Sequence, residues 1–176
     1  MRNLTSCILI LVSFNAFGQE ITVGDTTMIR EIQRKCSIIY DTKDSTIFLL
    51  TKSTFYKNAE SGTNIVVNSY KGKINRIVTF TTTRTGLLGG EFYFWESQVI
   101  MIYETMEYYD EDSPKGQIRN FKNIPYWESR FYINNKKIVA HRHSGRKGIG
   151  IDYTAQIEID NSKDIFEFVK EQTSLK

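Results

Sequence analysis

Two histidines in the C-terminal third of the chain are the residues best suited to chemistry. His141 and His143 are two positions apart, so on a β-strand both imidazoles point to the same side of the sheet. A hairpin that turns at residues 135–136 would place Glu128 opposite His143. Two imidazoles and one carboxylate can hold zinc, or serve acid–base chemistry in a small hydrolase. The simpler interpretation is a solvated strand face with a Glu–His contact, because the sequence marks no nucleophile nearby.

A run of acidic residues and tyrosines offers a second set of groups. Paired carboxylates can hydrolyse glycosides when one of them is buried, bind calcium or attract a basic protein. Charge runs are more often solvated, and Pro114 and Gly116 mark irregular chain just beyond the run. We therefore interpret residues 108–116 (YYDEDSPKG) as an exposed hairpin loop. The acidic residues of the whole run are Glu104, Glu107, Asp110, Glu111 and Asp112.

Three aromatic residues give the best indication of binding. Tyr93, Trp95 and Tyr132 fall on the face opposite the predicted core of two aromatic-rich strands. Flat rings exposed on a sheet are good platforms for sugars or for protein partners. The alternative is that a loop packs over this face and buries the rings. The sequence therefore predicts a ligand-binding surface here and leaves the alternative open.

Neither the cysteines nor a basic glycine-rich segment indicates a cofactor. Cys7 lies in the N-terminal apolar segment, which leaves Cys36 alone and excludes an internal disulfide in the rest of the chain. Cys36 is most simply a small buried residue, because a catalytic thiol would need a basic partner. Residues 145–150 (GRKGIG) lack the Lys-Ser/Thr pair of a phosphate-binding loop. We interpret them as a strand connection, with anion binding as the weaker alternative.

The first residues have the pattern of a secretory signal peptide. Arg2 precedes an apolar segment at 4–17, and Ala16 and Gly18 supply the small residues of a cleavage site. We predict that residues 1–18 are removed, which leaves one β-rich domain at 19–176 in the periplasm, at the cell surface or secreted. The apolar segment is too short to span a bilayer, so we predict no membrane span. The net charge of +3 is too small an excess to favour nucleic acid.

Helical periodicity appears near both ends of this domain. Apolar residues at three- and four-residue steps predict a helix over Thr26–Tyr40, which Asp25 or Thr26 can cap. The β-branched Ile38-Ile39 at its end could instead belong to a strand. A second helix is predicted over Ser162–Gln172. Between residues 151 and 160 apolar and polar residues alternate, which predicts a strand with one solvated face. Residues 58–63 (NAESGT) are of turn-forming types.

A repeated sequence pattern predicts the structure of the rest of the chain. Residues 91–102 (EFYFWESQVIMI) and 130–141 (RFYINNKKIVAH) each place aromatic residues before a short polar segment and aliphatic residues after it. Each is a β-hairpin if Glu96–Ser97 and Asn135–Lys136 are two-residue turns. Residues 69–77 (SYKGKINRI) resemble a degenerate third copy, with Lys71–Gly72 as its turn. We therefore predict an α+β fold, mainly antiparallel β, in which a meandering sheet of repeated hairpins carries the N-terminal and C-terminal helices on one face. The side chains expected on that face are Phe92, Phe94, Val99, Met101, Phe131, Ile133, Ile138 and Ala140.

Three segments, at residues 58–77 (NAESGTNIVVNSYKGKINRI), 89–104 (GGEFYFWESQVIMIYE) and 128–139 (ESRFYINNKKIV), also carry a family resemblance. In this order they resemble small exported proteins of Bacteroidota, which combine a helix, a Ser-Thr-Glu-Gly-Gly-like turn and hairpins of the type Tyr-Tyr-Phe-x-Asn-Gly-Lys-Leu-Ile. At the turns this chain has Glu96-Ser97 and Asn135-Lys136 in place of Asn-Gly. The resemblance covers most of the chain after residue 18. It implies export and a hairpin-repeat sheet, and it transfers no catalytic residue.

Three classes of function fit these patterns. The leading hypothesis is an exported, non-catalytic binding or interaction module for a glycan, a peptide or an envelope protein, including an inhibitor that inserts the acidic segment into an enzyme's cleft. The second is a small hydrolase or metal-binding protein that uses His141, His143 and Glu128. The third is a lipocalin-like carrier of a small ligand, which needs a closed barrel around an apolar interior. The sequence does not choose between an open sheet and a closed barrel, and it leaves the oligomeric state open.

Overall fold

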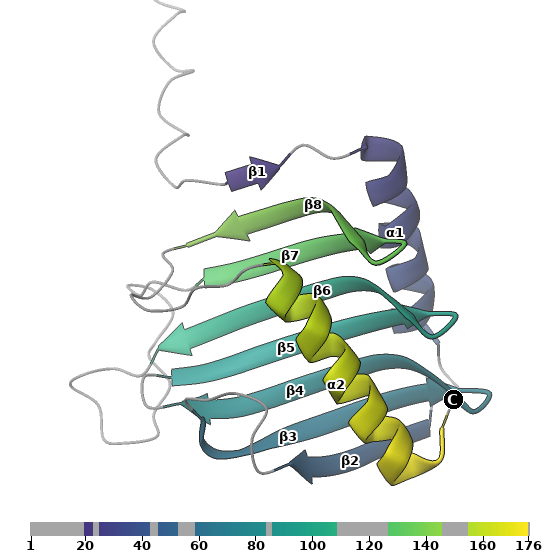
Figure 1. Ribbon diagram of the computed structural model, residues 1–176, viewed down its shortest axis with the longest axis vertical. Helices are drawn as coiled ribbons and strands as arrows, with labels where there is room; N and C mark the ends of the chain where they lie inside the picture. The colour runs from purple at the N-terminus through teal and green to yellow at the C-terminus, as the bar shows by residue number, and fades with distance from the viewer. Residues whose placement is uncertain are drawn as a thin grey trace, which may run out of the picture.

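A computed structural model describes residues 20–22, 25–42, 46–52, 59–83, 86–108, 127–145 and 155–175 of the chain. Eight antiparallel strands form one sheet in the order β1-β8-β7-β6-β5-β4-β3-β2, and two α-helices pack on it (Figure 1). The elements are β1 (Glu20–Thr22), α1 (Thr26–Tyr40), β2 (Thr46–Lys52), β3 (Ala59–Tyr70), β4 (Lys73–Thr83), β5 (Gly86–Trp95), β6 (Gln98–Tyr108), β7 (Trp127–Asn134), β8 (Lys137–Ser144) and α2 (Ala155–Thr173). The predicted meander is confirmed. The described strands form an open sheet, because β1 and β2 at its two ends do not pair with each other.

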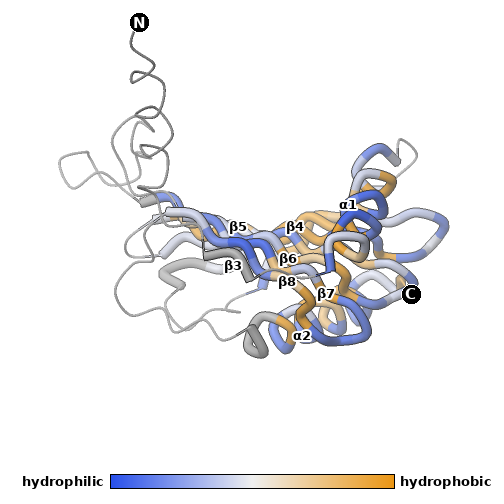
Figure 2. The backbone as a smooth tube through the Cα atoms, turned by 90° about the horizontal axis from the view of Figure 1, so that it is seen from above, coloured by the Kyte–Doolittle hydropathy of each residue, from blue (hydrophilic) through white to orange (hydrophobic). Residues whose placement is uncertain are grey.

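The two helices cover opposite faces of the sheet. Helix α1 packs with Tyr93 and Tyr132, whereas α2 packs with side chains that alternate with these, such as Phe92 and Phe131. Figure 2 shows α1 above the sheet and α2 below it. The prediction that both helices share one face is wrong, because both faces of the central strands are apolar and each face needs its own cover. We call these faces the α1 side and the α2 side.

All three predicted two-residue turns have left-handed backbone conformations. The φ angles are 52° and 73° at Lys71–Gly72, 52° and 62° at Glu96–Ser97, and 49° and 62° at Asn135–Lys136. Positive φ at both central residues is the type I′ geometry, whose twist matches that of the flanking strands. Phe94 pairs with Val99 across the second turn as predicted, and the third hairpin pairs in the same way. The second and third hairpins therefore have type I′ turns although the chain lacks Asn-Gly at both turns.

Each hairpin also carries a bulge at the same place, the third residue after its turn. Shifts in the strand register leave Asn75, Ile100 and Val139 without an opposite residue. A bulge changes the face to which the following side chains point, relative to strict alternation. Met101 and Ala140 therefore pack on the α1 side, which corrects the prediction that they lie with the core residues before the turn. The other six side chains predicted for that face do lie on the α2 side.

Helix α1 begins, ends and faces the sheet as the sequence predicts. The Asp25 side chain accepts hydrogen bonds from the backbone N–H groups of Thr27 and Met28, at 2.8 Å and 3.3 Å. This N-cap satisfies donors that have no partner within the helix. The buried residues recur at three- and four-residue steps and are Ile29, Ile32, Cys36 and Ile39.

The sequence predictions are wrong for two other segments. Residues 155–160 belong to helix α2, where we expected a strand, and residues 151–154 lie outside the described part of the chain. The helical period continues through this segment, because Ile159, Ser162 and Ile165 are all buried at three-residue steps. Residues 59–63 belong to β3 rather than to a turn, and the pairing of β3 with β4 is irregular there.

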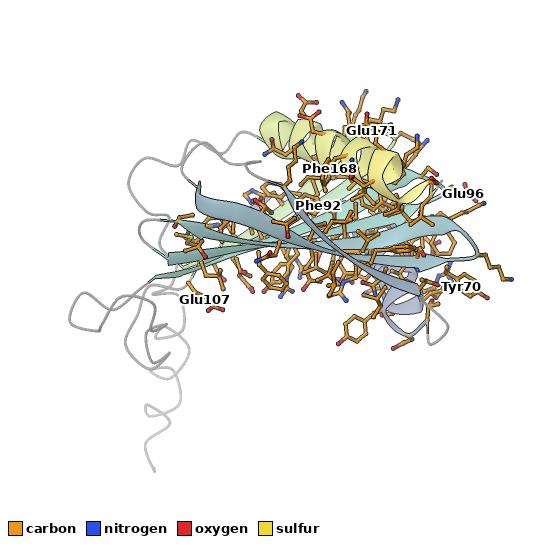
Figure 3. All side chains as sticks on the ribbon, turned by 90° about the horizontal axis from the view of Figure 1, so that it is seen from below. Tyr70, Phe92, Glu96, Glu107, Phe168 and Glu171 are labelled. Atoms are coloured by element: carbon orange, nitrogen blue, oxygen red, sulfur yellow. The ribbon has the colours of Figure 1, made fainter. Side chains whose placement is uncertain are left out.

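The main core lies between the sheet and α2. Figure 3 shows Phe92 directed toward α2, whereas Tyr70 and Glu107 lie on the opposite side of the sheet. The Phe94 and Phe166 rings, from the sheet and from α2, have centroids 4.7 Å apart. The core residues from α2 are Ile159, Ile165, Phe166 and Val169.

The turn geometry makes a stability prediction. The Lys136→Gly variant should raise the free energy of unfolding by about 0.5–1 kcal/mol, because glycine adopts the left-handed φ of 62° without the steric cost that a side chain brings. Urea unfolding followed by circular dichroism measures the change. The matched control is Lys137→Gly one residue later, in strand β8, where glycine should destabilise the protein by a similar amount. Equal effects of both variants would contradict the assigned turn.

Candidate functional site

Helix α1 covers the aromatic surface that the sequence predicts as a binding site. Tyr93 and Tyr132 are buried, and Trp95 packs against the same cluster. The Gln33 Nε2 atom donates a hydrogen bond to the Tyr132 hydroxyl at 3.2 Å, and the Lys35 Nζ atom lies 5.5 Å from the Trp95 ring centroid. The prediction of an exposed platform is therefore wrong, and a helix rather than a loop supplies the cover.

The structure separates the three residues of the predicted metal site. The bulge at Val139 shifts the register, so Glu128 lies opposite Ser144 and on the α1 side. His143 lies opposite Ser129 on the α2 side, together with His141. The two imidazoles and the Glu128 carboxylate therefore point to opposite faces of the sheet. Among the described residues, no group of three or more His, Cys, Asp and Glu side chains lies close enough to hold a metal ion.

The α2 side instead brings His143 into a buried polar row. Cross-strand pairing aligns Glu104, Ser129 and His143 on β6, β7 and β8. The Ser129 Oγ atom and the His143 Nδ1 atom are hydrogen-bonded at 2.9 Å, and the Glu104 carboxyl is almost fully buried. The next residue of the same strand face, His141, stacks on the Phe131 ring at a centroid distance of 4.3 Å. Among the described residues, this row of a carboxylate, a hydroxyl and an imidazole most resembles a catalytic triad.

The order of the groups in that row does not suit acyl transfer. A serine nucleophile needs a histidine between it and the carboxylate, so that the imidazole both takes the proton and is held by the acid. Here Ser129 lies between Glu104 and His143. Strand β7 also pairs on both sides, so its backbone N–H groups are engaged in the sheet and cannot form an oxyanion hole. The row is better understood as a hydrogen-bonded polar layer within the fold.

The acidic run and the basic glycine-rich segment are described only in part. Glu104 and Glu107 belong to β6, and the Glu104 side chain is buried. Asp110, Glu111 and Asp112 lie outside the described residues, as does the segment from 146 to 150. The hypotheses of glycoside hydrolysis, calcium binding and anion binding at these segments stay predictions.

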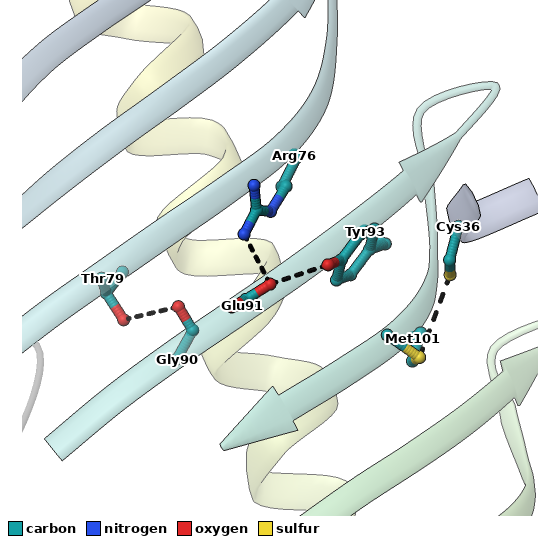
Figure 4. Close-up of polar contacts among 7 residues, drawn as sticks. All are labelled: Cys36, Arg76, Thr79, Gly90, Glu91, Tyr93 and Met101. Atoms are coloured by element: carbon teal, nitrogen blue, oxygen red, sulfur yellow. Dashed lines mark hydrogen bonds and ion pairs between the residues drawn. The ribbon is translucent and has the colours of Figure 1, made fainter. Parts of the chain in front are cut away.

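Cys36 is a core residue of α1. It is buried, and its Sγ atom lies 3.9 Å from the Met101 Sδ atom (Figure 4). Burial raises the pKa of the Cys36 thiol to about 12. A group with a raised pKa stays protonated at neutral pH, and the thiol is not the nucleophilic species. The structural interpretation of Cys36 therefore fits its surroundings better than the catalytic one.

Thiol labelling tests this assignment. In the native Cys7→Ser variant, Cys36 should react with iodoacetamide at least about a hundredfold more slowly than in the urea-unfolded chain, because the thiolate fraction at pH 8 is on the order of one in ten thousand when the pKa is near 12. Mass spectrometry of timed samples gives both rates. Rapid labelling of the native chain would contradict the burial of the thiol.

Beyond α1, the α1 side carries a connected set of polar and aromatic side chains. Pairing places Glu91, Tyr103, Arg130 and Arg142 in one row across β5, β6, β7 and β8, and Glu128 lies in the next row. All five residues are half-buried or exposed. We call these five residues the Tyr103 surface.

Tyr103 and its neighbours hold one another in place. The Tyr103 hydroxyl donates a hydrogen bond to the Glu128 Oε2 atom at 2.7 Å. The Arg130 guanidinium lies 4.8 Å from the Tyr103 ring centroid and 3.4 Å from the same carboxylate oxygen. Arg142 is exposed, with its guanidinium 5.8 Å from the Tyr132 ring centroid. The surface therefore presents ordered charges and rings.

Glu91 joins the Tyr103 surface to the part of the sheet beneath α1. Its Oε2 atom accepts hydrogen bonds from Arg76 and from the Tyr93 hydroxyl, each at 2.7 Å (Figure 4). Burial, together with the hydrogen bond to Glu91, raises the pKa of Tyr93 above its ordinary range. The phenol therefore remains protonated and keeps donating to the carboxylate. Glu91 is fixed from two sides at the border between the covered and the open part of the face.

Sequence reasoning missed the Tyr103 surface, although two signals pointed to it. Arg130 and Tyr132 alternate with buried residues along β7, which places Arg130 on the same face as the aromatic residues. Tyr103 alternates in the same way with the buried residues Ile102 and Glu104. What the sequence could not show is which part of that face α1 would cover.

Comparison of the chain with protein-family models, with curated proteins and with solved structures finds no match. None of the helices in the described part of the chain is long and apolar enough to cross a membrane.

Proposed function

We propose that the protein is an exported, non-catalytic interaction module that binds a protein partner of the cell envelope through the Tyr103 surface. The observation that carries the proposal is the ordered set of aromatic and charged side chains on the open part of the α1 side. Side chains that already hold their bound geometry lose little conformational entropy when a partner docks. The N-terminal signal-like segment is the basis for placing that partner in the envelope.

The composition of this part of the face favours a protein over a small molecule. The row of the Tyr103 surface and the rows on either side of it, across β4 to β8, contain Arg76, Arg130 and Arg142 but no lysine. Tyrosine and arginine are enriched in protein interfaces, and lysine is depleted. Small-molecule sites are usually concave, whereas the Tyr103 surface extends over four neighbouring strands on one face of an open sheet. A glycan remains the alternative ligand, because its hydroxyls would also suit fixed arginine and carboxylate groups.

Site-specific photo-crosslinking tests the proposal in the producing cell. A photo-reactive amino acid in place of Arg142, which is exposed at the edge of the Tyr103 surface, should give a discrete protein adduct after irradiation. The matched control carries the same amino acid in place of Lys163, which is also exposed but lies on α2. Adding Arg130→Glu to the Arg142 variant should reduce the adduct at least about tenfold, as expected when a central interface arginine is lost.

The outcomes separate the partner classes. Equal labelling from positions 142 and 163, or an adduct that survives Arg130→Glu, would contradict a partner at the Tyr103 surface. If glycosidases remove the adduct and proteases do not, the partner is a glycan and not a protein.

Export is tested separately. N-terminal sequencing of the protein from fractionated cells should find the chain outside the cytoplasm and beginning at Gln19. A cytoplasmic chain that still begins at Met1 would exclude an envelope partner.

A further inference from the structure

Strand β2 is the open edge of the described sheet. Within the described residues it pairs with β3 alone, and it is seven residues long. Proteins usually protect such edges with short strands, prolines or charges, because free N–H and C=O groups accept another strand. The strand at the other end, β1, has three residues, whereas β2 carries a single charge, on its last residue Lys52, and no proline.

The side chains of this edge are apolar and exposed. Leu49 lies in one α1-side row with Val66 and Val78 on the next two strands. Leu49 is 78% exposed, Val66 is half-buried and Val78 is 8% exposed. Exposure falls along this row with distance from the edge, and within the described sheet Val66 and Val78 have a paired strand on both sides whereas Leu49 has one on a single side. A further strand beside β2 would cover Leu49 in the same way that β2 covers Val66.

We propose that β2 pairs in antiparallel fashion with β2 of a second copy of the chain, with the two Leu49 residues opposite each other on a twofold axis. Leu49 is the middle residue of Thr46–Lys52, so this register pairs the whole strand. The two sheets would then join into one sheet, with the α1 sides of both copies on the same face. The inference concerns a different strand from the Tyr103 surface and does not depend on the proposed function.

The strand is complementary to itself in this register. Ile47 would lie opposite Thr51 of the second copy, and Phe48 opposite Leu50 of the second copy. Phe48 and Leu50 already pack at the edge of the core on the α2 side, so the apolar layer would continue across the axis. Lys52 would lie opposite the neutral Thr46, which avoids the like-charge pairs that destabilise strand pairing. This self-complementarity favours a second copy over an unrelated strand.

Sedimentation velocity over a range of concentrations tests the pairing with the protein purified as the cell processes it. The wild-type chain should form a dimer, and Leu49→Lys should weaken the dimer at least about tenfold, because two lysines would face each other on the axis. The matched control is Phe80→Lys, on the same side of the sheet but on β4, away from the edge. It should leave the dimer intact. A monomeric wild-type chain, or equal losses in the two variants, would overturn edge pairing.

Cysteine crosslinking tests the register itself. Opposite residues of antiparallel strands have Cα atoms about 4.5–5.5 Å apart, within reach of a disulfide. Leu49→Cys should therefore form a disulfide dimer under mild oxidation. Ile47→Cys should not, because the two copies of residue 47 would be offset by four residues, about 13 Å. Mixing Ile47→Cys with Thr51→Cys should restore crosslinking between the two chains. Crosslinking of Ile47→Cys alone, or none with Leu49→Cys, would overturn the register.

Discussion

Phe92→Ala should lower the free energy of unfolding by about 3–5 kcal/mol. Phe92 is 0% exposed on the central strand β5, between Ile77 and Ile102 on the neighbouring strands. The Phe92 ring also packs closely over Gly90, because a Cβ atom added at Gly90 would lie only 3.0 Å from the Phe92 Cε2 atom. Since β5 is held by strand pairing on both sides, the sheet cannot close the cavity that the ring leaves. Urea unfolding followed by circular dichroism gives the change.

The matched control for this prediction is Phe80→Ala. Phe80 is 42% exposed on the α1 side of the adjacent strand β4, so its loss leaves no closed cavity and should cost less than about 1 kcal/mol. Similar losses in the two variants would show that the core does not lie between β5 and α2.

Ile32→Ala should lower the free energy of unfolding by about 2–4 kcal/mol. Ile32 is buried in the middle of α1, in the cluster that contains Tyr93 and Tyr132. The loss should also loosen the docking of α1, since this cluster is what holds the helix on the sheet. Hydrogen exchange of the α1 amides should therefore accelerate more than that of the central strands.

The same helix supplies a control of the same chemistry. Ile38 is 44% exposed on the outer face of α1, so Ile38→Ala should change the free energy of unfolding by no more than about 0.5 kcal/mol. Alanine's higher helix propensity offsets part of the lost contact. If Ile38→Ala accelerated the exchange of α1 as strongly as Ile32→Ala, the assigned docking face would be wrong.

The sequence was sufficient for the strands and the turns, and insufficient for the register beyond the turns. Aromatic and aliphatic residues around Glu96–Ser97 and Asn135–Lys136 defined the hairpins even without glycine. The bulges at Ile100 and Val139 have no comparable mark, because any residue type can be the unpaired one. A shift of one residue exchanges the two faces of a strand. Glu128 therefore lies on the face opposite the two histidines, although the sequence predicted that all three share a face.

The covering of the aromatic residues was equally beyond the sequence. Alternation placed Tyr93 and Tyr132 on the face opposite Phe92, which is correct. The apolar stripe of α1 would fit either face, because both faces are apolar near the turns. The sequence therefore predicted an amphipathic helix and an aromatic face without indicating that one covers the other. The Tyr103 surface follows only once the position of α1 is known.

The order of the strands has a consequence for the way in which the chain folds. From β2 to β8 every strand pairs with its neighbour in the chain, whereas β1 pairs with β8 and α1 packs on the second half of the sheet. Contacts between chain neighbours form quickly, and contacts between distant segments form slowly. The N-terminal segment leaves the ribosome first and is among the last to find its place. We therefore expect the sheet to form before α1 docks, so that Tyr93 and Tyr132 face solvent during this stage and the uncovered sheet is the form most prone to aggregate.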